Sequence, residues 1–457
     1  MSLAERMDAQ SVPVTRVLAA RAAATRLDEV PEEARAVARQ CLIDWFAVTL
    51  AGCGEPAIAM LDAEAREDGG AEQATLVGLG RKASVAQAAL INGTASHALD
   101  YDDVNSTLSG HPTVAVAPAV LALAEQRRMS GAEMLQAFIA GYEVACRVGA
   151  LVAPGHYQRG FHATGTVGSF GAAAGAGVAL GLDEDAIATA LGIAAAQAAG
   201  LKHLFGTMCK PLHAGKAAAN GLQAARLSAR GFSSRDDILE AGQGFAAVTS
   251  DDFNPETAVA ENATWHVRNT LFKYHAACYL THASIDVLQE MVVDSAVRPE
   301  EVDRVTLTVD PGHLKVCNIV EPDTGLEVKF SLRHTAAFAL AGVDTADISA
   351  YDDALARRPD LVELRRKVEV EPEPGLARVS RVALRRKDGS VLTGSFDSGV
   401  PAADVVAQGR RLDTKFMSLV APALGEAEAT ALLRDLHDLE RLPDLETVMG
   451  RASTRVA

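Results

Sequence analysis

The sequence predicts a mainly α protein with a large all-helical domain and a smaller inserted α+β lid domain. Ala/Gly-rich apolar segments with helical spacing fill the first 270 residues. A two-residue alternation of apolar and polar side chains, which is typical of strands, starts only after about Tyr274, and helical patterning returns from Ala402. We therefore predict a helical domain over 1–270 that is completed by 400–457, and an α+β lid domain over 271–399.

The composition limits the kind of protein and its partners. The chain has 457 residues, of which 49% are hydrophobic, so it can bury a large core and form more than one domain. Its formal net charge of -16 argues against nucleic acid or an anionic membrane surface as a partner. The six cysteines are scattered without a C-x-x-C pair, unlike a disulfide framework or a zinc ribbon. Residues 1–15 lack the apolar core of a secretory signal, and polar residues or glycine interrupt the apolar stretches, so we expect a cytoplasmic protein without membrane spans.

The helical segments of the first domain are recognised by their ends and their spacing. Residues 31–50 begin with Pro31, which suits a first turn, and Glu32 and Glu33 suit the positive end of the helix dipole. A second helix is expected over 84–101. Further Ala/Leu/Val-rich segments with helical spacing cover 113–127, 131–151, 165–180, 185–198 and 214–230.

One of these segments is unusually rich in small residues. Residues 168–177 have the sequence GSFGAAAGAG, with a single large side chain. This composition predicts a helix packed very close to its neighbours. A phosphate-binding loop is the alternative, but no strand precedes the segment and the G-x-G-x-x-G context of a Rossmann fold is missing.

The second domain and the tail have a different pattern. Alternation predicts three strands, and the sequence KDGS at 387–390 predicts a hairpin turn in which Gly389 supplies the positive φ. The tail after about Ala402 contains a clear helix at 426–439, and we expect it to pack back on the first domain. The predicted strands cover 302–309, 379–384 and 391–396, with helices between them at 332–342 and 346–355.

The segment from His97 to His111 is the most polar stretch between two apolar helices. His97 and Asp100 are three residues apart, so we expect them to share a helix face. Asp102 and Asp103 follow where that helix is expected to end. Aspartate is seldom buried unless it is paired, and a polar cluster between two apolar helices is not needed for folding. This cluster is therefore a candidate active site. The alternative is a helix cap followed by a solvated turn.

Two further polar groups follow along the chain. His162 lies just before a glycine-containing helix and could line a pocket, although a single histidine is more often an ordinary surface or core residue. Lys210 precedes Pro211, which predicts an extended backbone and a lysine placed to bind a carboxylate. His213 and Lys216 follow within two turns. The alternative for Lys210 is a lysine that extends its ammonium into solvent at a helix end.

A fourth group lies at the predicted domain junction, where clefts commonly form. The segment 273–282 contains Lys273, His275, Cys278 and His282. The alternative is a helix start with one polar face. For Cys278 we favour the role of a small core residue, because free cysteine is usually buried.

The four groups, in this order, resemble the MmgE/PrpD family, which includes 2-methylcitrate dehydratase, cis-aconitate decarboxylase and iminodisuccinate epimerase. The resemblance runs from about residue 35 to 339. It implies a helical domain with an α+β lid inserted before the C-terminal helices, a homodimer and no cofactor. The matching strings are NGTASHALDYDD, SGHPT, FHATGTVGSFGAAA, CKPLHAGKAAANG and KYHAACYLTHASID.

The resemblance also implies roles for individual residues. The catalytic residues that it implies are Asp100, His111, His162, Lys210 and Lys273. We further predict that the substrate-binding residues are His97, Asp103, His213, His275, Cys278 and His334, and we predict no metal ligand. Cys278 stands where the decarboxylases have histidine, and His334 stands where they have tyrosine. The stretch 100–111 is one residue longer. These departures speak against cis-aconitate decarboxylation.

The members of this family make or break a C–H bond next to a carboxylate. Lysines stabilise the negative charge that develops there, and histidine is suited to move the proton near neutral pH. We predict a cofactor-independent lyase that acts on a hydroxylated di- or tricarboxylate, similar to 2-methylcitrate dehydratase. An epimerase or racemase of an amino- or imino-dicarboxylate is the closest alternative, and cis-aconitate decarboxylase is less favoured.

Two alternatives come from other classes. A metal-dependent hydrolase would use the carboxylates and imidazoles of 97–111, which are suitable ligand types, but their spacing matches no zinc signature such as H-E-x-x-H. A non-catalytic helical binding protein would have an apolar cleft and would turn its lysines to solvent.

Overall fold

The computed structural model of the chain describes residues 12–261 and 265–456. It is 60% helical and 10% strand, which confirms the predicted mainly α fold class. The chain forms two compact units, one over Met1–Phe272 with Ala403–Ala457 and the other over Lys273–Ala402. The first unit is therefore discontinuous in sequence. Its bounds lie close to the boundaries expected from the sequence at 270 and 400.

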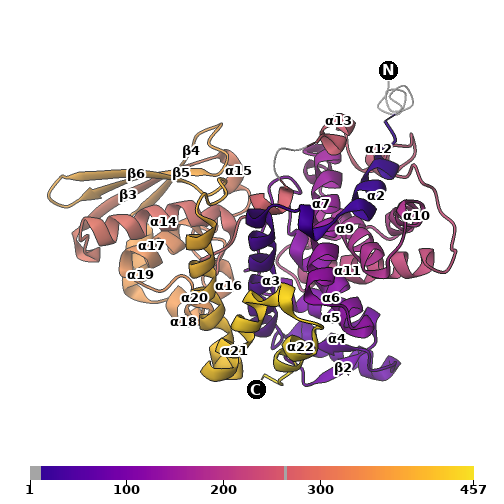
Figure 1. The fold of residues 1–457 in the computed structure, drawn as a ribbon. Helices are drawn as coiled ribbons and strands as arrows, with labels where there is room; N and C mark the ends of the chain where they lie inside the picture. The colour runs from indigo at the N-terminus through magenta and orange to yellow at the C-terminus, as the bar shows by residue number, and fades with distance from the viewer. Residues whose placement is uncertain (1–11, 262–264, 457) are drawn as a thin grey trace. The chain divides into compact units, whose positions relative to one another are not determined.

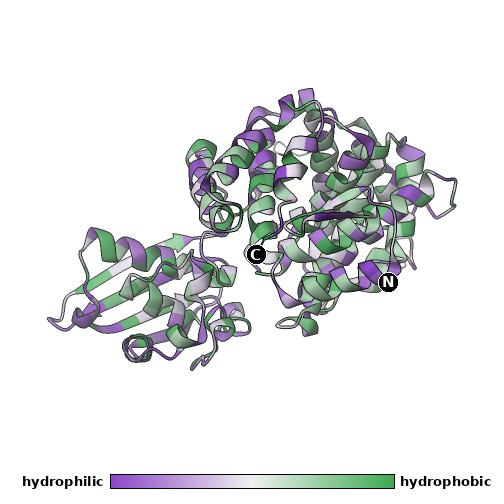
Figure 2. Ribbon diagram, turned by 90° about the horizontal axis from the view of Figure 1, so that it is seen from below, coloured by the Kyte–Doolittle hydropathy of each residue, from purple (hydrophilic) through white to green (hydrophobic). Residues whose placement is uncertain are grey.

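The first unit is built from long helices that lie side by side (Figure 1). Helices α5, α6, α7, α9 and α11 pack against one another in its interior. Figure 2 shows mainly hydrophobic residues in this interior and hydrophilic residues on the outer helices. The bounds are α2 Val14–Ala24, α3 Glu32–Gly52, α4 Pro56–Asp68, α5 Val85–His97, α6 Pro112–Arg127, α7 Gly131–Val152, α9 Ala163–Leu180, α10 Glu184–Ala195 and α11 Cys209–Ser228.

The C-terminal tail completes the same unit. Helix α20 (Val405–Leu424) packs on α3, as expected from the sequence, and α21 (Glu426–His437) and α22 (Glu446–Ala452) follow it. The unit also contains a short antiparallel hairpin, β1 (Ala74–Leu76) and β2 (Arg81–Ala83), which the sequence analysis did not predict. Its strands have only three residues each, too few to show an alternation of apolar and polar side chains.

The small residues of α9 allow very close helix packing, as predicted. A Cβ atom added to Gly171 would lie 2.6 Å from the Cβ of Ala145 in α7. A Cβ added to Gly221 in α11 would lie 2.5 Å from the Cβ of Ala172 in α9. Real Cβ atoms do not approach so closely, so glycine is required where these helices touch. The glycine-rich segment is a buried helix and not a phosphate loop.

Two helices in the described part of the chain, α7 and α9, are long and apolar enough to cross a membrane. A third candidate arises only if α3 and α4, which meet at a bend of 85°, are counted as one span. In both α7 and α9, 89% of the apolar window is buried inside the fold. A long apolar helix that is covered by other helices has the pattern of a core helix.

Two expectations about local backbone are wrong. Helix α5 ends at His97 and does not continue to 101, and Asp100 has a φ of 52°. His97 and Asp100 therefore do not share a helix face. Lys210 is not extended, because α11 begins at Cys209 and includes it. Pro211 is tolerated there because the first turn of a helix has no internal partners for its N–H groups.

The second unit contains a four-stranded sheet in the order β4-β3-β5-β6 (Figure 1). The strands are β3 Val302–Val309, β4 Val368–Pro372, β5 Val379–Arg386 and β6 Val391–Asp397. The three predicted strands are confirmed, and Gly389 in the hairpin turn has a φ of 90°. Strand β4, which pairs parallel with β3, was not predicted. The helices that pack on the sheet are α14 Tyr279–Asp294 and α17 Leu332–Ala341.

The helix expected over 346–355 is wrong. That stretch forms two short turns, η5 (Ile348–Ala350) and α18 (Asp353–Ala356). The side chain of Asp347 accepts from the Ser349 N–H, and the side chain of Asp352 accepts from the Leu355 N–H. An aspartate cap at each start favours two separate turns over one continuous helix.

The packing of α9 against α11 predicts opposite effects for two glycine-to-alanine substitutions. Gly221→Ala should lower the free energy of unfolding by about 1–3 kcal/mol, because the new methyl group overlaps backbone and side-chain atoms of α9. Gly450→Ala in α22 meets no atom within 4 Å and should raise stability by about 0.5–1 kcal/mol through helix propensity. Denaturant unfolding measures both. Equal stability of the two variants would contradict close packing.

Candidate active site

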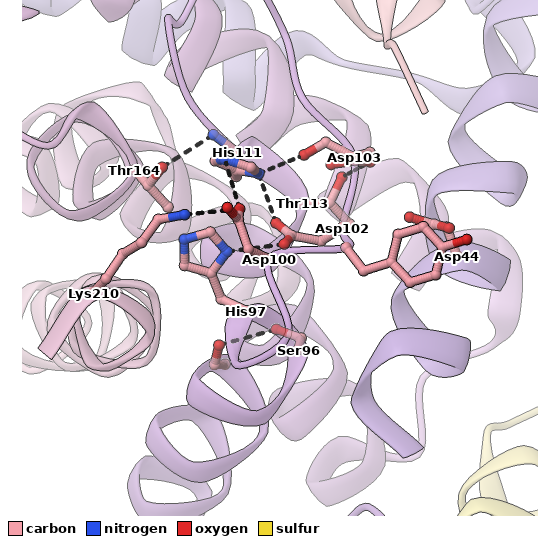
Figure 3. Close-up of polar contacts among 12 residues, drawn as sticks. Asp44, Ser96, His97, Asp100, Asp102, Asp103, His111, Thr113, Thr164 and Lys210 are labelled. Atoms are coloured by element: carbon pink, nitrogen blue, oxygen red, sulfur yellow. Dashed lines mark hydrogen bonds and ion pairs between the residues drawn. The ribbon is translucent and has the colours of Figure 1, made fainter. Parts of the chain in front are cut away.

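The loop between α5 and α6 and the helix ends that flank it bring a group of titratable side chains into contact (Figure 3). His97 is the last residue of α5, and His111 is the N-cap of α6. Isolated bridges between Val104 and Leu271 and between Asn105 and Gly110 shape the loop. Helix ends and a short bridged loop therefore bring together residues that are up to 14 positions apart in sequence.

A single carboxylate lies between two imidazoles. Asp102 Oδ1 is 2.9 Å from His97 Nδ1, and Asp102 Oδ2 is 2.8 Å from His111 Nδ1. The Nδ1 atom of His111 is also 2.8 Å from the carbonyl oxygen of Asp103. Oxygens that only accept place the ring proton on Nδ1 of each histidine and leave each Nε2 as the basic atom.

Asp102 is absent from the residues that the sequence analysis assigned to catalysis or substrate binding. The sequence DYDD offers three aspartates, and the resemblance singled out the first of them. Asp100 was expected to share a helix face with His97, on the assumption of a continuous helix. The structure instead places Asp102 against His97, because the chain leaves the helix after His97.

Lys210 and Asp100 form the part of the cluster that solvent reaches. Lys210 Nζ is 2.7 Å from Asp100 Oδ1, and their side chains are 13% and 21% exposed. The same Asp100 oxygen is 3.9 Å from His111 Nε2. The side chain of Asp102 is only 2% exposed. An incoming anion can thus reach the ammonium of Lys210 and Nε2 of His111, whereas Asp102 is covered.

His162 and His213 extend the cluster. His162 is the N-cap of α9, and its Nδ1 is 3.0 Å from Nδ1 of His213 in α11. The ring of His162 stacks on that of His97 with 5.8 Å between centroids, and Phe205 packs edge-on against His162 at 4.9 Å. Three of the four predicted groups are therefore side by side in the first unit.

Three long helices begin at this cluster. His111 precedes α6, His162 precedes α9, and Lys210 lies in the first turn of α11. The N-terminus of a helix carries a partial positive charge and unpaired N–H groups, which favour anions. Together with the Lys210 ammonium, these helix ends make the cluster a suitable environment for carboxylates.

Asp103 supports the loop. Its Oδ2 accepts a hydrogen bond from the hydroxyl of Thr113 in α6 at 2.5 Å, and its backbone carbonyl accepts from His111. Burial raises the pKa of Asp103 well above its ordinary value, and the nearby Asp44 carboxylate adds to this. The Thr164 hydroxyl accepts from the backbone N–H of His111 at 3.1 Å and fixes the start of α6.

The remaining predicted residues lie in the second unit. Lys273 is 1% exposed, and Cys278 is the N-cap of α14. His275 Nδ1 is 2.7 Å from the Thr345 hydroxyl oxygen. His334 is buried in α17 with its ring 5.0 Å from that of Phe338. The participation of these four residues in the site stays a prediction.

Burial sets the protonation states of the cluster. It lowers the pKa of His97 to about 4, although Asp102 acts in the opposite direction. Burial also lowers the pKa of His162 well below its ordinary value, and the neighbouring His97 and Lys210 lower it further. Burial alone would raise the pKa of Asp102, but His111 and His97 hold it well below its ordinary value. Near neutral pH the cluster therefore holds an ionised Asp102 and neutral His97 and His162.

The same residues include possible metal ligands. Ligand atoms of His97, Asp100, Asp102 and His111 all lie within 4.8 Å of one another. However, Nδ1 of each histidine lies against Asp102, and the Lys210 ammonium is paired with Asp100. A cation bound to all four residues would have to displace that ammonium. The geometry matches proton transfer more closely than it matches a metal centre.

The lowered pKa of His97 predicts acid sensitivity. The folded pKa of about 4 is below the ordinary value of 6.5, so the unfolded chain binds the proton first as the pH falls. The stabilisation is complete above pH 6.5 and is lost towards pH 4. His97→Gln should therefore reduce the difference in unfolding free energy between pH 7 and pH 4 by up to about 3 kcal/mol. Urea unfolding at pH 7 and at pH 4 measures this difference, and His203→Gln, at an exposed histidine, is the control. An unchanged difference would contradict a buried neutral His97.

Family models match both parts of the chain. The MmgE/PrpD N-terminal domain matches residues 16–258. The MmgE/PrpD C-terminal domain matches residues 275–439, so that its match includes part of the tail that packs in the first unit. The first match ends, and the second begins, close to the change from the helical to the α+β unit at residues 272–273.

Curated relatives give a consistent result. The chain is 28% identical over 376 residues to cis-aconitate decarboxylase of Homo sapiens, with 78% of this chain and 77% of that protein covered. It is 26% identical over 408 residues to cis-aconitate decarboxylase of Aspergillus terreus, with 82% of each covered. The resemblance found from the five sequence motifs is confirmed, and the chain belongs to the MmgE/PrpD family.

Proposed function

We propose that this protein is a cofactor-independent lyase that removes a proton next to a carboxylate of a hydroxylated di- or tricarboxylate and expels the β-hydroxyl as water. One observation carries the proposal: a buried carboxylate lies between two imidazoles, beside a lysine that solvent reaches. The family membership supports lyase chemistry on carboxylic acids, because relatives at 26–28% identity are named cis-aconitate decarboxylase.

Substrate binding begins at Lys210. Its ammonium is 13% exposed and paired with Asp100, so a substrate carboxylate can share it. When the adjacent C–H bond loses its proton, negative charge moves onto the substrate carboxylate. A fixed cation in a largely dry site stabilises that charge more in the transition state than in the ground state. The N-termini of α6, α9 and α11 act in the same direction.

His111 is the base in this proposal. Asp102 and the Asp103 carbonyl hold the proton on Nδ1, so Nε2 carries the lone pair, 3.9 Å from the Asp100 carboxylate. Nε2 takes the proton, and the ionised Asp102 stabilises the resulting imidazolium. The C–H electron pair forms the C=C bond, and the C–O bond breaks.

The leaving hydroxyl needs a proton to depart as water. The imidazolium of His111 supplies it in a syn elimination. The His162–His213 pair supplies it in an anti elimination only after the pair has taken up a proton from solvent, because His162 is otherwise neutral. The side chain of Asp100 can carry a proton between Lys210 and His111. The stereochemistry of the product distinguishes the two routes.

Decarboxylation is the second candidate, and the names of the relatives favour it. In that reaction the C–C bond to a carboxylate breaks, CO₂ leaves, and the proton goes to the carbon that keeps the electron pair. Cys278 and His334, which depart from the decarboxylase pattern, speak against it. A third outcome is epimerisation, in which the proton removed from the carbon next to the carboxylate is replaced on the opposite face of that carbon.

A screen of polycarboxylates by NMR in deuterated buffer tests the proposal. We expect loss of a β-hydroxyl and appearance of an alkene signal with a hydroxylated di- or tricarboxylate. Loss of CO₂ would favour decarboxylation, and deuterium at the α-carbon without elimination would favour epimerisation. A folded enzyme that leaves the whole panel unchanged would contradict the proposal.

Two variants test the assigned site with the substrate found by the screen. Lys210→Ala and His162→Ala should each lower kcat by at least about 100-fold without loss of fold. Lys216→Ala is the matched control, because Lys216 lies in the same helix and is exposed. Full activity of both site variants would show that the site is wrong.

Metal analysis and a chelator separate this proposal from a metal-dependent hydrolase. We expect turnover to survive a chelator. Loss of activity that a divalent cation restores would favour the four-residue cluster as a metal centre. The expected homodimer and cytoplasmic location stay predictions.

A further inference from the structure

A buried lysine from the C-terminal tail reaches the loop that carries the candidate site. Lys415 lies in α20, and its side chain is 3% exposed. Its Nζ donates to Asp44 Oδ1 in α3 at 2.6 Å and to the backbone carbonyl oxygen of Tyr101 at 2.7 Å. The ammonium also lies 3.9 Å from the centroid of the Tyr101 ring.

The hydrogen bond from Lys415 reaches a residue that lies between two members of the candidate site. Tyr101 stands between Asp100, which binds Lys210, and Asp102, which lies between the two imidazoles. The φ of 52° at Asp100 is a conformation that residues other than glycine rarely adopt. Such a conformation persists only where the surroundings impose it. The hydrogen bond to the Tyr101 carbonyl acts on the next residue along the chain.

Stability alone is a weak reason for a buried ion pair. Removing two charges from water costs several kcal/mol per ion, and well-packed apolar residues of similar volume often stabilise a fold as well or better. The Lys415–Asp44 pair is 3% and 1% exposed, so it bears that cost. What an apolar pair could not provide is a donor for the Tyr101 carbonyl.

We propose that Lys415 is a positioning residue, which fixes the Asp100–Asp102 loop by its hydrogen bond to the Tyr101 carbonyl and so couples the C-terminal tail to the active site. The inference rests on the proposed function for its effect on turnover. Its effect on the loop does not depend on which reaction the enzyme catalyses.

Hydrogen exchange and kinetics on the full chain test the proposal. In Lys415→Met, amides of 98–111 should exchange about tenfold faster, while amides of α9 keep their wild-type rates. With the substrate found by the screen, kcat should fall about 100-fold and KM should change less than about threefold, because misplaced catalytic groups cost rate more than binding. Lys415→Arg keeps the charge and the hydrogen-bond donors. Its exchange rates over 98–111 and its kcat should therefore lie between those of Lys415→Met and the wild type.

Two further variants separate positioning from folding. Asp44→Leu with Lys415→Met removes both buried charges, so it should fold even where Lys415→Met alone does not. It still lacks the donor to Tyr101, and we expect fast exchange of 98–111 and low kcat. Arg451→Met is the matched control, since Arg451 pairs with Asp435 at 2.8 Å in the same tail without reaching the loop.

The outcomes are distinct. Wild-type exchange of 98–111 and wild-type kcat in the double variant would overturn the proposal, because the pair would then serve the fold alone. If no polycarboxylate is turned over, the proposed function fails while exchange still decides the role of Lys415. In that case fast exchange confined to 98–111 in the double variant supports it, and unchanged exchange refutes it.

Discussion

The carboxylate of Asp102, held between His97 and His111, is the constraint on which the site depends. It is buried, and its two oxygens are 2.9 and 2.8 Å from the Nδ1 atoms of the two rings. A buried charge without partners would be costly, so the two imidazoles and the carboxylate stabilise one another in this arrangement. The consequence is chemical: both rings keep their protons on Nδ1, and Nε2 of His111 is the basic atom nearest to Asp100 and Lys210.

Close packing of the helices in the first unit brings the residues of this site together. Glycines at the contacts of α7, α9 and α11 allow backbones to approach where a methyl group would overlap them. The ends of these helices and of their neighbours then meet at one place. His97 ends α5, His111 and His162 precede α6 and α9, and Lys210 lies in the first turn of α11. Side chains placed on helices are positioned more precisely than side chains placed on loops.

Much of the fold followed from the periodicity of the sequence. The long helices have spacing and ends that single residues reveal, and the alternating strands of the second unit were predicted with a turn at Gly389. Strand β4 was missed although its sequence VEVEP alternates, because the run is only five residues long and ends in a proline. Its place beside β3 depends on pairing between distant segments, which local patterns do not show.

The sequence predicted most of the residues that lie in the candidate site, but it did not predict which of them contact each other. His97, Asp100, His111, His162, Lys210 and His213 do lie together, as the family resemblance implies. The shared helix face of His97 and Asp100 was wrong, since the apolar spacing that predicts the helix does not reveal that Asp100 adopts a left-handed φ after the helix has ended. The contact of Lys415 with Tyr101 joins residues 314 positions apart, and a lone lysine in a helical tail gives no sign of it.

Nitrogen-15 NMR of the histidine rings in the wild-type enzyme tests the central claim most directly. Long-range ring spectra distinguish a proton on Nδ1 from a proton on Nε2, and His97→Gln and His111→Gln assign the two signals. The structure predicts that His97 is a neutral Nδ1–H tautomer near pH 7 with its proton directed to Asp102, and that Nδ1 of His111 carries a proton that lies between Asp102 and the Asp103 carbonyl oxygen. A proton on Nε2 of His111, with Nδ1 unprotonated, would contradict the account, because the atom assigned as the base would then have no lone pair.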